Sequence, residues 1–325
     1  MLDNKTIILL LLLLTMVSLT TAITIYIVKR NKAKKINSDN IRNKKEILPI
    51  ENLPSGNLST ENYIGPYKII KLIGKGASSK VYLVTKDNKN FAAKLFQHKD
   101  PELLERFKRE IEILKQIKHI NIVQIFDYGE SNGIPYLILE YVDGKTFDEI
   151  YPNLTTLQKI DIILEISNAL NYLHNKGIIH RDIKPENILV DKDLKKVKLT
   201  DMGISRIVYW KPITHDGQVL GTLAYMAPEI FEGVLSDPRI DIYSLGITMY
   251  EIFTNRVPFE GNPSEIINKH MKEIPVLPSL INPNIPSQLD KVIMKCIEKN
   301  PERRYKSISK LIEDLILVKE TIKKS

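Results

Sequence analysis

The chain has 325 residues, of which 43% are hydrophobic and 26% charged, so it can hold one large domain or two smaller ones with a sizeable core. Its net charge of +8 is uneven, because residues 29–45 contain eight lysines or arginines and one aspartate. Asp3 and Lys5 cancel, which leaves about +1 from residue 46 onward and argues against a nucleic-acid-binding surface there. Cys296 is the only cysteine, which excludes an intrachain disulfide.

Residues 7–28 form a run of 22 uncharged residues rich in Leu and Ile. A helix that rises about 1.5 Å per residue can cross a hydrocarbon layer of about 30 Å with this length. A cleaved signal peptide is the alternative, but its apolar core of about 7–15 residues is shorter and ends in small residues that are not evident here. We therefore expect a tail at residues 1–6, too short for an outer sensor domain, and a transmembrane helix at residues 7–28.

The segment after this helix predicts its orientation in the membrane. The basic residues of 29–45 follow the apolar run, and such residues stay on the cytoplasmic side, so residues 29–325 are expected in the cytoplasm. The basic run either contacts anionic lipid or acts only as a stop-transfer flank. Residues 46–63 are rich in Asn, Ser, Pro, Gly and Glu, which is typical of a linker. We assign 29–66 to this juxtamembrane segment and linker.

The folded domain is expected to begin at residue 67. Strand-like residues 67–73 and 80–84 flank a glycine-containing turn, where the lack of a Cβ would let the backbone approach phosphates. By itself this pattern also fits an ordinary hairpin. Lys94 follows in an apolar strand, where a lysine is costly to bury unless it is paired. A helix over residues 101–117 carries Glu110 beside its apolar face, either as that partner or as a solvated charge.

Further elements follow along the chain. Residues 122–128 and 135–142 predict two strands joined by a turn, so that four or five strands precede residue 142, and Asp143-Gly144 breaks the second one. A helix covers residues 160–173. Polar residues at 180–187 then precede a hairpin formed by residues 188–190 and 197–199, and Asp201 lies two residues after it. Carboxylates, an ammonium group and an amide placed at both ends of a hairpin suit phosphoryl transfer.

Several motifs in one order resemble the eukaryotic-type protein kinases. They are G-x-G at 74–76, H-R-D-I-K-P-E-N at 180–187 and D-x-G at 201–203. The apolar strand that contains Lys94 lies between the first two motifs. The run G-T-x-x-Y-M-A-P-E at 221–229 is similar to that of bacterial Ser/Thr kinases. The resemblance covers about residues 67–318. It implies an α+β, bilobal fold with a small β-rich N-lobe at 67–142 and a large helical C-lobe at 143–318, followed by a tail at 319–325.

The resemblance also implies the roles of individual residues. Asp182 would accept or orient the proton of the substrate hydroxyl, and Lys184 would contact the γ-phosphate of ATP. Asn187 and Asp201 would bind Mg²⁺. Lys94 would pair with Glu110 and hold the α- and β-phosphates. The implied nucleotide-binding residues are Ile73, Gly74, Lys75, Gly76, Ala77, Ser78, Ser79, Lys80, Val81, Ala92, Lys94, Glu110, Glu140, Val142 and Leu189.

The C-terminal half carries further features of the family. Lys184 and Thr222 favour serine or threonine over tyrosine as the acceptor, and Thr214 and Thr222 are candidate phosphorylation sites within residues 201–229. Arg181 is expected to lack a partner unless a phosphate or an acid arrives, which indicates control by phosphorylation. Two structural contacts are also implied. Asp241 would hold the backbone of residues 180–187, and Arg304 would pair with Glu229.

The sequence departs from the family pattern at Ser79, where a third glycine is usual, and at Met202, where phenylalanine is usual. We expect a membrane-anchored Ser/Thr protein kinase that uses ATP and Mg²⁺ and acts on proteins, including itself, but not on nucleic acid. The alternative is a pseudokinase scaffold that binds nucleotide or partners without catalysis, supported only by these two departures. A small-molecule kinase is a third reading, which the substrate-platform-like residues 222–229 oppose.

Overall fold

The computed structural model describes residues 63–76, 79–96, 111–131, 133–201 and 223–324, all of which belong to the unit Thr60–Ser325. The expected transmembrane helix and the basic segment lie outside these residues. Among the helices that are described, none is long and apolar enough to cross a membrane.

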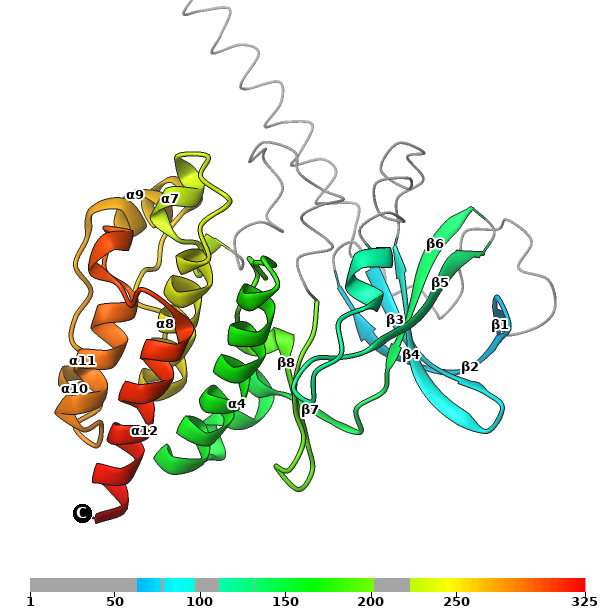
Figure 1. Ribbon diagram of the computed structural model, residues 1–325, viewed down its shortest axis with the longest axis horizontal. Coiled ribbons are helices and arrows are strands. Elements are labelled where there is room, and N and C mark those ends of the chain that lie inside the picture. Colours follow the sequence, from blue (N-terminus) through cyan, green and yellow to red (C-terminus); the bar gives the residue numbers. More distant parts are fainter. Residues whose placement is uncertain (1–62, 77–78, 97–110, 132, 202–222, 325) are drawn as a thin grey trace, which may run out of the picture. The chain divides into compact units, whose positions relative to one another are not determined.

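The N-terminal part is an antiparallel sheet with the strand order β1-β2-β3-β4-β6-β5 (Figure 1). The turn between β3 and β4 consists of Asp87 and Asn88, which both have positive φ, 50° and 58°. Such a turn has the twist that a two-residue hairpin requires. The six strands are β1 (Tyr63–Ile64), β2 (Tyr67–Lys75), β3 (Ser79–Lys86), β4 (Lys89–Phe96), β5 (Ile125–Ser131) and β6 (Ile134–Glu140).

The sheet differs from the expected one at three places. It has six strands and not four or five, because β1 lies before residue 67 and buries Ile64, which is 2% exposed. The strand expected over residues 122–128 begins only at Ile125. Residues 122–124 bond elsewhere, since the Val123 N–H donates to the Leu199 carbonyl and the Gln124 carbonyl accepts from the Glu140 N–H. Strand β6 ends at Glu140 and not at residue 142.

A small sheet, with the order β7-β8-β9, follows the larger one. It consists of β7 (Gly144–Thr146), β8 (Ile188–Asp191) and β9 (Val197–Leu199), so the expected hairpin at 188–199 is confirmed. The sequence does not predict strand β7, because Asp143-Gly144 is typical of a strand break. A Cβ at Gly144 would lie 2.0 Å from the Val190 carbonyl oxygen, so only glycine allows β7 to approach β8 this closely.

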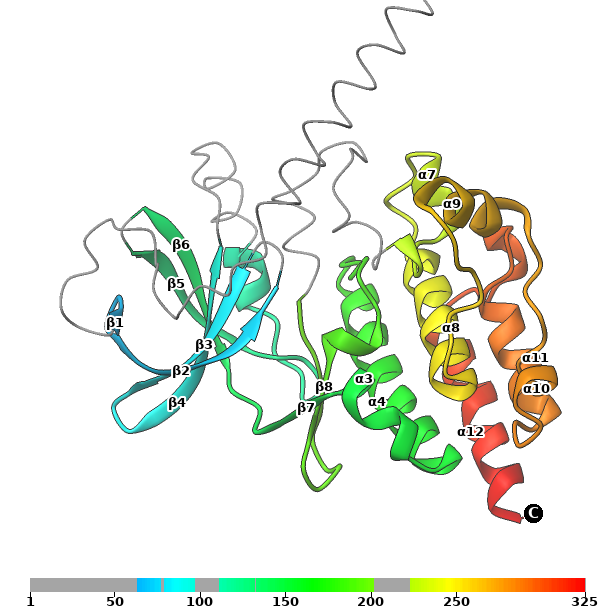
Figure 2. The same cartoon turned by 180° about the vertical axis from the view of Figure 1, so that it is seen from behind.

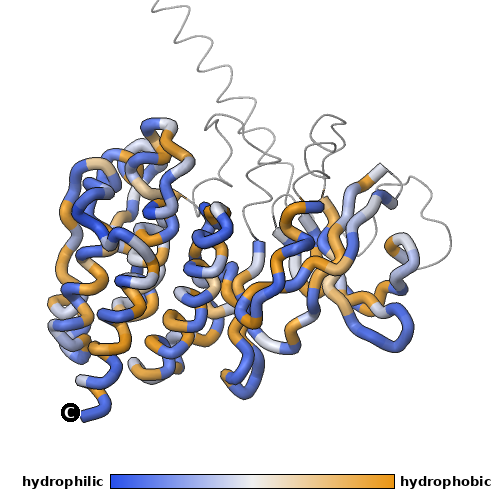
Figure 3. The backbone as a smooth tube through the Cα atoms, in the orientation of Figure 1, coloured by the Kyte–Doolittle hydropathy of each residue, from blue (hydrophilic) through white to orange (hydrophobic). Residues whose placement is uncertain are grey.

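The C-terminal part is helical. Helix α8 is buried along most of its length, and both α4 and α11 pack against it (Figure 2). Hydrophobic and hydrophilic residues mix along α4 and α12, as expected for helices with one buried face (Figure 3). The helices are α3 (Phe147–Ile150), α4 (Thr156–Asn175), α7 (Pro228–Phe231), α8 (Arg239–Thr254), α9 (Pro263–Lys272), α10 (Pro278–Ile281), α11 (Ser287–Cys296) and α12 (Ile308–Lys324), with 3-10 helices η1 (Tyr151–Asn153), η2 (Pro185–Asn187) and η3 (Pro301–Arg303).

Two helix predictions are confirmed where the structure describes them. Helix α4 covers the expected residues 160–173 and begins with a capping box, in which Thr155 accepts from the Gln158 N–H and the Gln158 side chain accepts from the Thr155 N–H. Residues 111–115 are helical, so this helix ends two residues before the expected residue 117, and Ile111 and Leu114 are buried as the predicted apolar face requires. Glu110 lies outside the described residues.

His270 on α9 makes the stability of this part depend on pH. Its ring is fully buried, its Nδ1 lies 2.8 Å from the Tyr243 hydroxyl oxygen, and burial lowers its pKa from 6.5 to about 3. Between about pH 3 and pH 6.5, the two pKa values of His270, the unfolded chain binds a proton at His270 and the folded chain does not. We therefore expect the free energy of unfolding to be fully retained above pH 6.5 and to fall below it by about 1.4 kcal/mol per pH unit from this group.

Urea unfolding of the wild type and of His270→Gln at pH 7 and pH 5 measures this slope. The variant should lose much of the difference between the two pH values, since glutamine does not titrate. Tyr243→Phe is the matched control, because it removes the hydroxyl partner but leaves the imidazole. It should lower the stability at both pH values and keep the slope. An unchanged slope in His270→Gln would contradict the assignment.

Candidate active site

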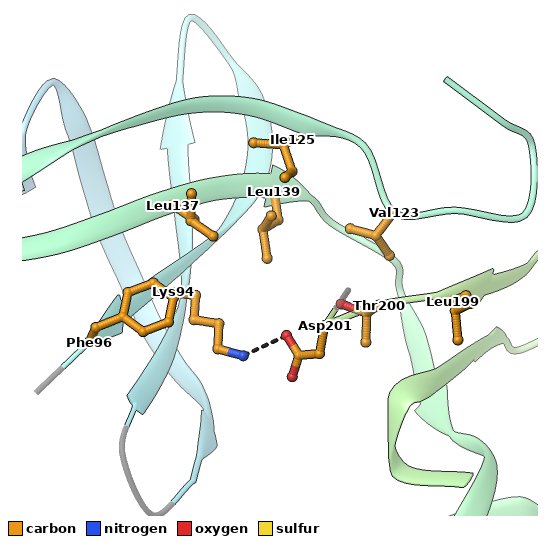
Figure 4. Close-up of a pocket in the computed structure, with 9 residues that line it drawn as sticks. All are labelled: Lys94, Phe96, Val123, Ile125, Leu137, Leu139, Leu199, Thr200 and Asp201. Carbon is orange, nitrogen blue, oxygen red and sulfur yellow. Dashed lines mark hydrogen bonds and ion pairs between the residues drawn. The ribbon is translucent and has the colours of Figure 1, made fainter. Parts of the chain in front are cut away.

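A small cavity lies between the larger sheet and the end of β9 (Figure 4). Two of its lining residues are charged, Lys94 from β4 and Asp201 after β9, and they point toward each other with 2.5 Å between Lys94 Nζ and Asp201 Oδ1. The other lining side chains are mostly apolar, which weakens screening and strengthens this ion pair. The full lining is Lys94, Phe96, Val123, Ile125, Leu137, Leu139, Leu199, Thr200 and Asp201.

The sheet register explains why Lys94 reaches this point. Directly paired residues of antiparallel strands share a face. One row across the sheet contains Val81, Lys94 and Leu137, and the next row contains Ala92 and Leu139. The two rows place an apolar surface around a single ammonium group, and the 2.5 Å ion pair compensates the cost of burying that group.

Asp201 is held as a charged and conformationally strained residue. Burial would raise the pKa of its carboxyl, but the charge and hydrogen bond of Lys94 outweigh this, and the pKa is lowered. The carboxylate is therefore ionised at neutral pH. Its φ of +60° is in the left-handed region, which is uncommon for residues other than glycine and often marks functional sites.

A second carboxylate, Asp182, is fixed by its own loop. The side-chain amide nitrogen of Asn187 donates to the Asp182 carbonyl oxygen at 2.7 Å and to Asp182 Oδ2 at 2.8 Å. Lys184 Nζ lies 3.9 Å from the same Oδ2 atom. A carboxylate held by an amide beside an ammonium group has the arrangement that a general base for a hydroxyl group requires.

His180 connects the Asp182 loop to Asp201. Its Nδ1 accepts from the Asp182 N–H at 3.3 Å, and its Nε2 lies 3.0 Å from the carbonyl oxygen of Thr200, the residue before Asp201. These two bonds assign the proton to Nε2 in a neutral ring. Burial lowers the pKa of this imidazole, which agrees with the neutral form. The ring thus fixes the spacing between the two loops without adding charge.

Asp241 on α8 binds the backbone of the same loop. It is fully buried and accepts from the backbone N–H groups of His180 at 2.8 Å and Arg181 at 2.7 Å. Its third contact is His174 Nε2 at 2.8 Å. Burial would raise the pKa of Asp241, but the hydrogen bond with His174 and the nearby imidazoles lower it, so the carboxylate stays ionised. The predicted role of Asp241 in holding this backbone is confirmed.

Comparison with known proteins identifies the family. A model of the protein kinase domain matches residues 67–315. This chain belongs to the protein kinase domain family. A probable serine/threonine-protein kinase of Clostridium acetobutylicum is 39% identical over 263 residues, 78% of this chain and 40% of that protein. PrkC of Bacillus subtilis is 35% identical over 260 residues, 77% of this chain and 40% of that protein. The chain thus spans about two fifths of the length of these relatives.

The solved kinase domain of Mycobacterium tuberculosis PknI has the same fold. It superimposes with a TM-score of 0.64 at 25% identity and covers 80% of this chain and 98% of that domain. The bilobal kinase fold expected from the sequence is therefore confirmed. The large sheet with the helix at residues 111–115 forms the N-lobe, and the helical part with the small sheet forms the C-lobe.

The glycine-rich loop of the kinase joins β2 to β3. The Gly76 N–H donates to the Ser79 carbonyl at 2.9 Å, which closes a tight turn. Ser79 is 8% exposed, pairs with Phe96 in the sheet and does not have a positive φ. The backbone at Ser79 therefore does not require glycine, and this departure from the family pattern lends no support to a pseudokinase. Ala77 and Ser78 lie outside the described residues.

The hinge of the kinase follows β6. The Glu140 N–H already donates to the Gln124 carbonyl at 2.8 Å, so the carbonyl of Glu140 is what this residue can offer to a nucleotide. The Val142 carbonyl accepts from the Gly144 N–H at 3.0 Å. Leu139, the residue before Glu140, lines the cavity. Of the other implied nucleotide residues, Ala92 and Val142 are buried, Val81 and Leu189 pack on the core, and Ile73, Lys75 and Gly76 are exposed.

The contacts of two arginines test further predictions. Arg304 and Glu229 form the predicted ion pair, with bonds of 2.6 and 2.8 Å. The Arg181 Nε donates to the Leu235 carbonyl at 3.2 Å, a neutral acceptor that supplies no counter-charge, so the prediction that a phosphate or an acid pairs with Arg181 stays a prediction. The expected partner of Lys94 was Glu110, and the described partner is Asp201. Glu110, Met202, Thr214 and Thr222 lie outside the described residues, so the predictions for them are untested.

Several residues at the site were not predicted. Phe96, Val123, Ile125, Leu137 and Leu199 line the cavity with apolar side chains, and each occupies an alternating position on or next to a strand. That alternation predicts a buried face but does not show which buried residues face the cavity. Their role depends on the meeting of β4, β5, β6 and β9, which come from separate parts of the sequence.

Proposed function

We propose that this chain is a serine/threonine protein kinase that transfers the γ-phosphoryl group of ATP to Ser and Thr hydroxyls of proteins, including its own. The observation that carries the proposal is the arrangement of two groups of acidic and basic side chains that His180 links. On one side Asn187 holds Asp182 beside Lys184, and on the other Lys94 contacts Asp201. The naming of the relatives as serine/threonine-protein kinases supports it.

The family uses ATP and Mg²⁺, and the residues present suit both. In the described part of the chain, no three His, Cys, Asp or Glu side chains gather into a metal site of their own. Mg²⁺ usually takes only one or two protein oxygens and completes its shell with phosphate and water. Asp201 offers a carboxylate, and Asn187 offers its amide oxygen because both of its bonds to Asp182 use the nitrogen. When bound, the ion would neutralise charge on the phosphates.

In the proposed reaction each side chain has one task. Asp182 Oδ accepts the proton of the Ser or Thr hydroxyl as the hydroxyl oxygen forms its bond to the γ-phosphorus and the bond to the bridging oxygen of ADP breaks. Lys184, 3.9 Å from that carboxylate, stabilises negative charge on the transferred group. Lys94 holds the α- and β-phosphates. Asp241 and His180 keep the loop backbone in place throughout.

We further propose that residues 7–28 anchor the chain in the cell membrane, with the kinase domain in the cytoplasm. The 22 uncharged residues and the basic residues that follow them support this proposal. Residues 29–45 contact anionic lipid or serve only as a stop-transfer flank. Carbonate extraction of membranes from cells that express the chain tests the anchor, and release of the chain into the supernatant would refute it.

Incubation of the full chain with γ-labelled ATP, Mg²⁺ and a generic protein substrate tests the kinase activity. We expect labelled phosphoserine or phosphothreonine in the substrate and in the chain itself. Lys94→Met should lower the transfer about a hundredfold, because an apolar side chain of similar length cannot hold the phosphates. Lys89→Met, in the same strand but exposed at the hairpin turn, is the control and should be as active as wild type. Wild-type protein without transfer, or with label only on phosphotyrosine, would refute the proposal.

A further inference from the structure

Glu140 at the end of β6 has a carboxylate that is shared by two lysines. Its Oε2 atom lies 2.6 Å from Lys198 Nζ, and its Oε1 atom lies 2.6 Å from Lys196 Nζ. The Gln124 N–H also donates to Oε2, at 3.3 Å. The Lys198 side chain is 8% exposed and that of Glu140 is 17% exposed, so this is a buried ion pair with a half-exposed second lysine.

The two ends of this pair belong to different parts of the nucleotide site. Glu140 is the first hinge residue, whose carbonyl would accept from adenine. Lys198 lies on β9, three residues before Asp201. Between them runs the segment 121–124, in which the Leu199 N–H donates to the Asn121 carbonyl and the Ile122 carbonyl accepts from Lys198 Nζ at 3.3 Å. The ion pair is thus one side-chain connection between the adenine end and the metal end of the site, beside the Lys94–Asp201 pair.

The electrostatics show that the pair is charged. Burial would raise the pKa of the Glu140 carboxyl, but the hydrogen bonds from Lys196 and Lys198 lower it, so Glu140 is ionised at neutral pH. A buried ion pair adds little net stability over an apolar pair of the same size, because desolvation offsets the attraction. Its hydrogen bonds nevertheless fix the distance and orientation of the two strands. The pair should therefore affect the distance and orientation of the two strands more than the stability of the fold.

We propose that the Glu140–Lys198 pair is a positioning pair that sets the spacing between the hinge backbone at Glu140 and the carboxylate of Asp201. The inference rests on the proposed kinase function of the same site. Without the pair, the hinge would still hold adenine, but Asp201 would no longer be held at the matching distance. The loss should therefore fall on the phosphate and Mg²⁺ end of the nucleotide and spare the adenine end.

Calorimetric titration of the full chain separates these two ends. We compare the affinities for adenosine, for ATP alone and for ATP with Mg²⁺ in wild type and Lys198→Met. The variant should bind adenosine within about twofold of wild type, whereas the gain in ATP affinity that Mg²⁺ produces should fall about tenfold. Lys198→Arg keeps the charge and should restore most of that gain. Glu140→Gln keeps the shape of the side chain and both lysines, and its affinities should resemble those of Lys198→Met. It replaces Lys198→Met in the comparison if that variant does not fold.

Lys192→Met is the matched control, because Lys192 forms a 2.8 Å ion pair with Asp143 beside the hinge, but both side chains are exposed. It should bind all three ligands like wild type. A wild-type Mg²⁺ gain in Lys198→Met and Glu140→Gln would overturn the inference, and so would an equal loss of adenosine and ATP affinity, which indicates a purely structural role. Wild-type protein that binds no ATP would overturn the proposed function together with the inference.

Discussion

Asp182→Asn is expected to transfer phosphate about a thousandfold more slowly than wild type and to bind ATP with nearly unchanged affinity. An asparagine has the size of an aspartate, and its oxygen can still accept the 2.8 Å bond from Asn187. It cannot accept the proton of the substrate hydroxyl. The loss should therefore appear in kcat, while the dissociation constant of ATP, measured by calorimetry, stays within about twofold.

The control for this variant is Asp193→Asn in the turn between β8 and β9. Asp193 is also an aspartate near a lysine, 3.7 Å from Lys195 Nζ, but both side chains are mostly exposed. It should keep the wild-type kcat. If Asp182→Asn were as active as Asp193→Asn, Asp182 would not be the base, and the assignment of the whole loop would fail.

The parts of the site that lie within one short motif could be predicted from the sequence. Asp182, Lys184 and Asn187 are at most five residues apart, so their contacts with one another lie within one short loop. Asp241 and Arg304 act over 60 and 75 residues, respectively. Only the resemblance to the kinase family could assign these contacts, because no local pattern encodes a partner so distant in the sequence.

Three features could not be predicted because they depend on how distant backbones meet. Residues 122–124 have strand character, but their carbonyl and N–H groups bond to Leu199, Lys198 and the hinge, so β5 begins later. Lys198 alternates with Val197 and Leu199, a pattern that favours a solvent-facing lysine, yet Glu140 and the Ile122 carbonyl bury it. Arg181 has the Leu235 carbonyl as a partner, 54 residues away.

Glu229→Gln is expected to lower the free energy of unfolding by about 3–5 kcal/mol, because it leaves the Arg304 guanidinium buried without a counter-charge. The Arg304 side chain is 0% exposed and that of Glu229 is 6% exposed. Arg304 also donates to the carbonyls of Glu298, Arg239 and Lys299, and its guanidinium lies 4.7 Å from the centre of the Tyr243 ring. These neutral contacts cannot replace the lost carboxylate. In a domain of this size we expect a fall in Tm of about 10 °C.

A double-mutant cycle separates the loss of the ion pair from the loss of packing. Arg304→Met should also destabilise, because it leaves the Glu229 carboxylate buried alone, but the double variant should be more stable than the sum of the two losses implies. Glu313→Gln on α12 is the control, since Glu313 pairs with Lys310 at 2.8 Å while both side chains are exposed. Its Tm should stay near that of wild type. If Glu229→Gln had the same Tm as Glu313→Gln, the buried pair would not hold α7 to the end of the C-lobe.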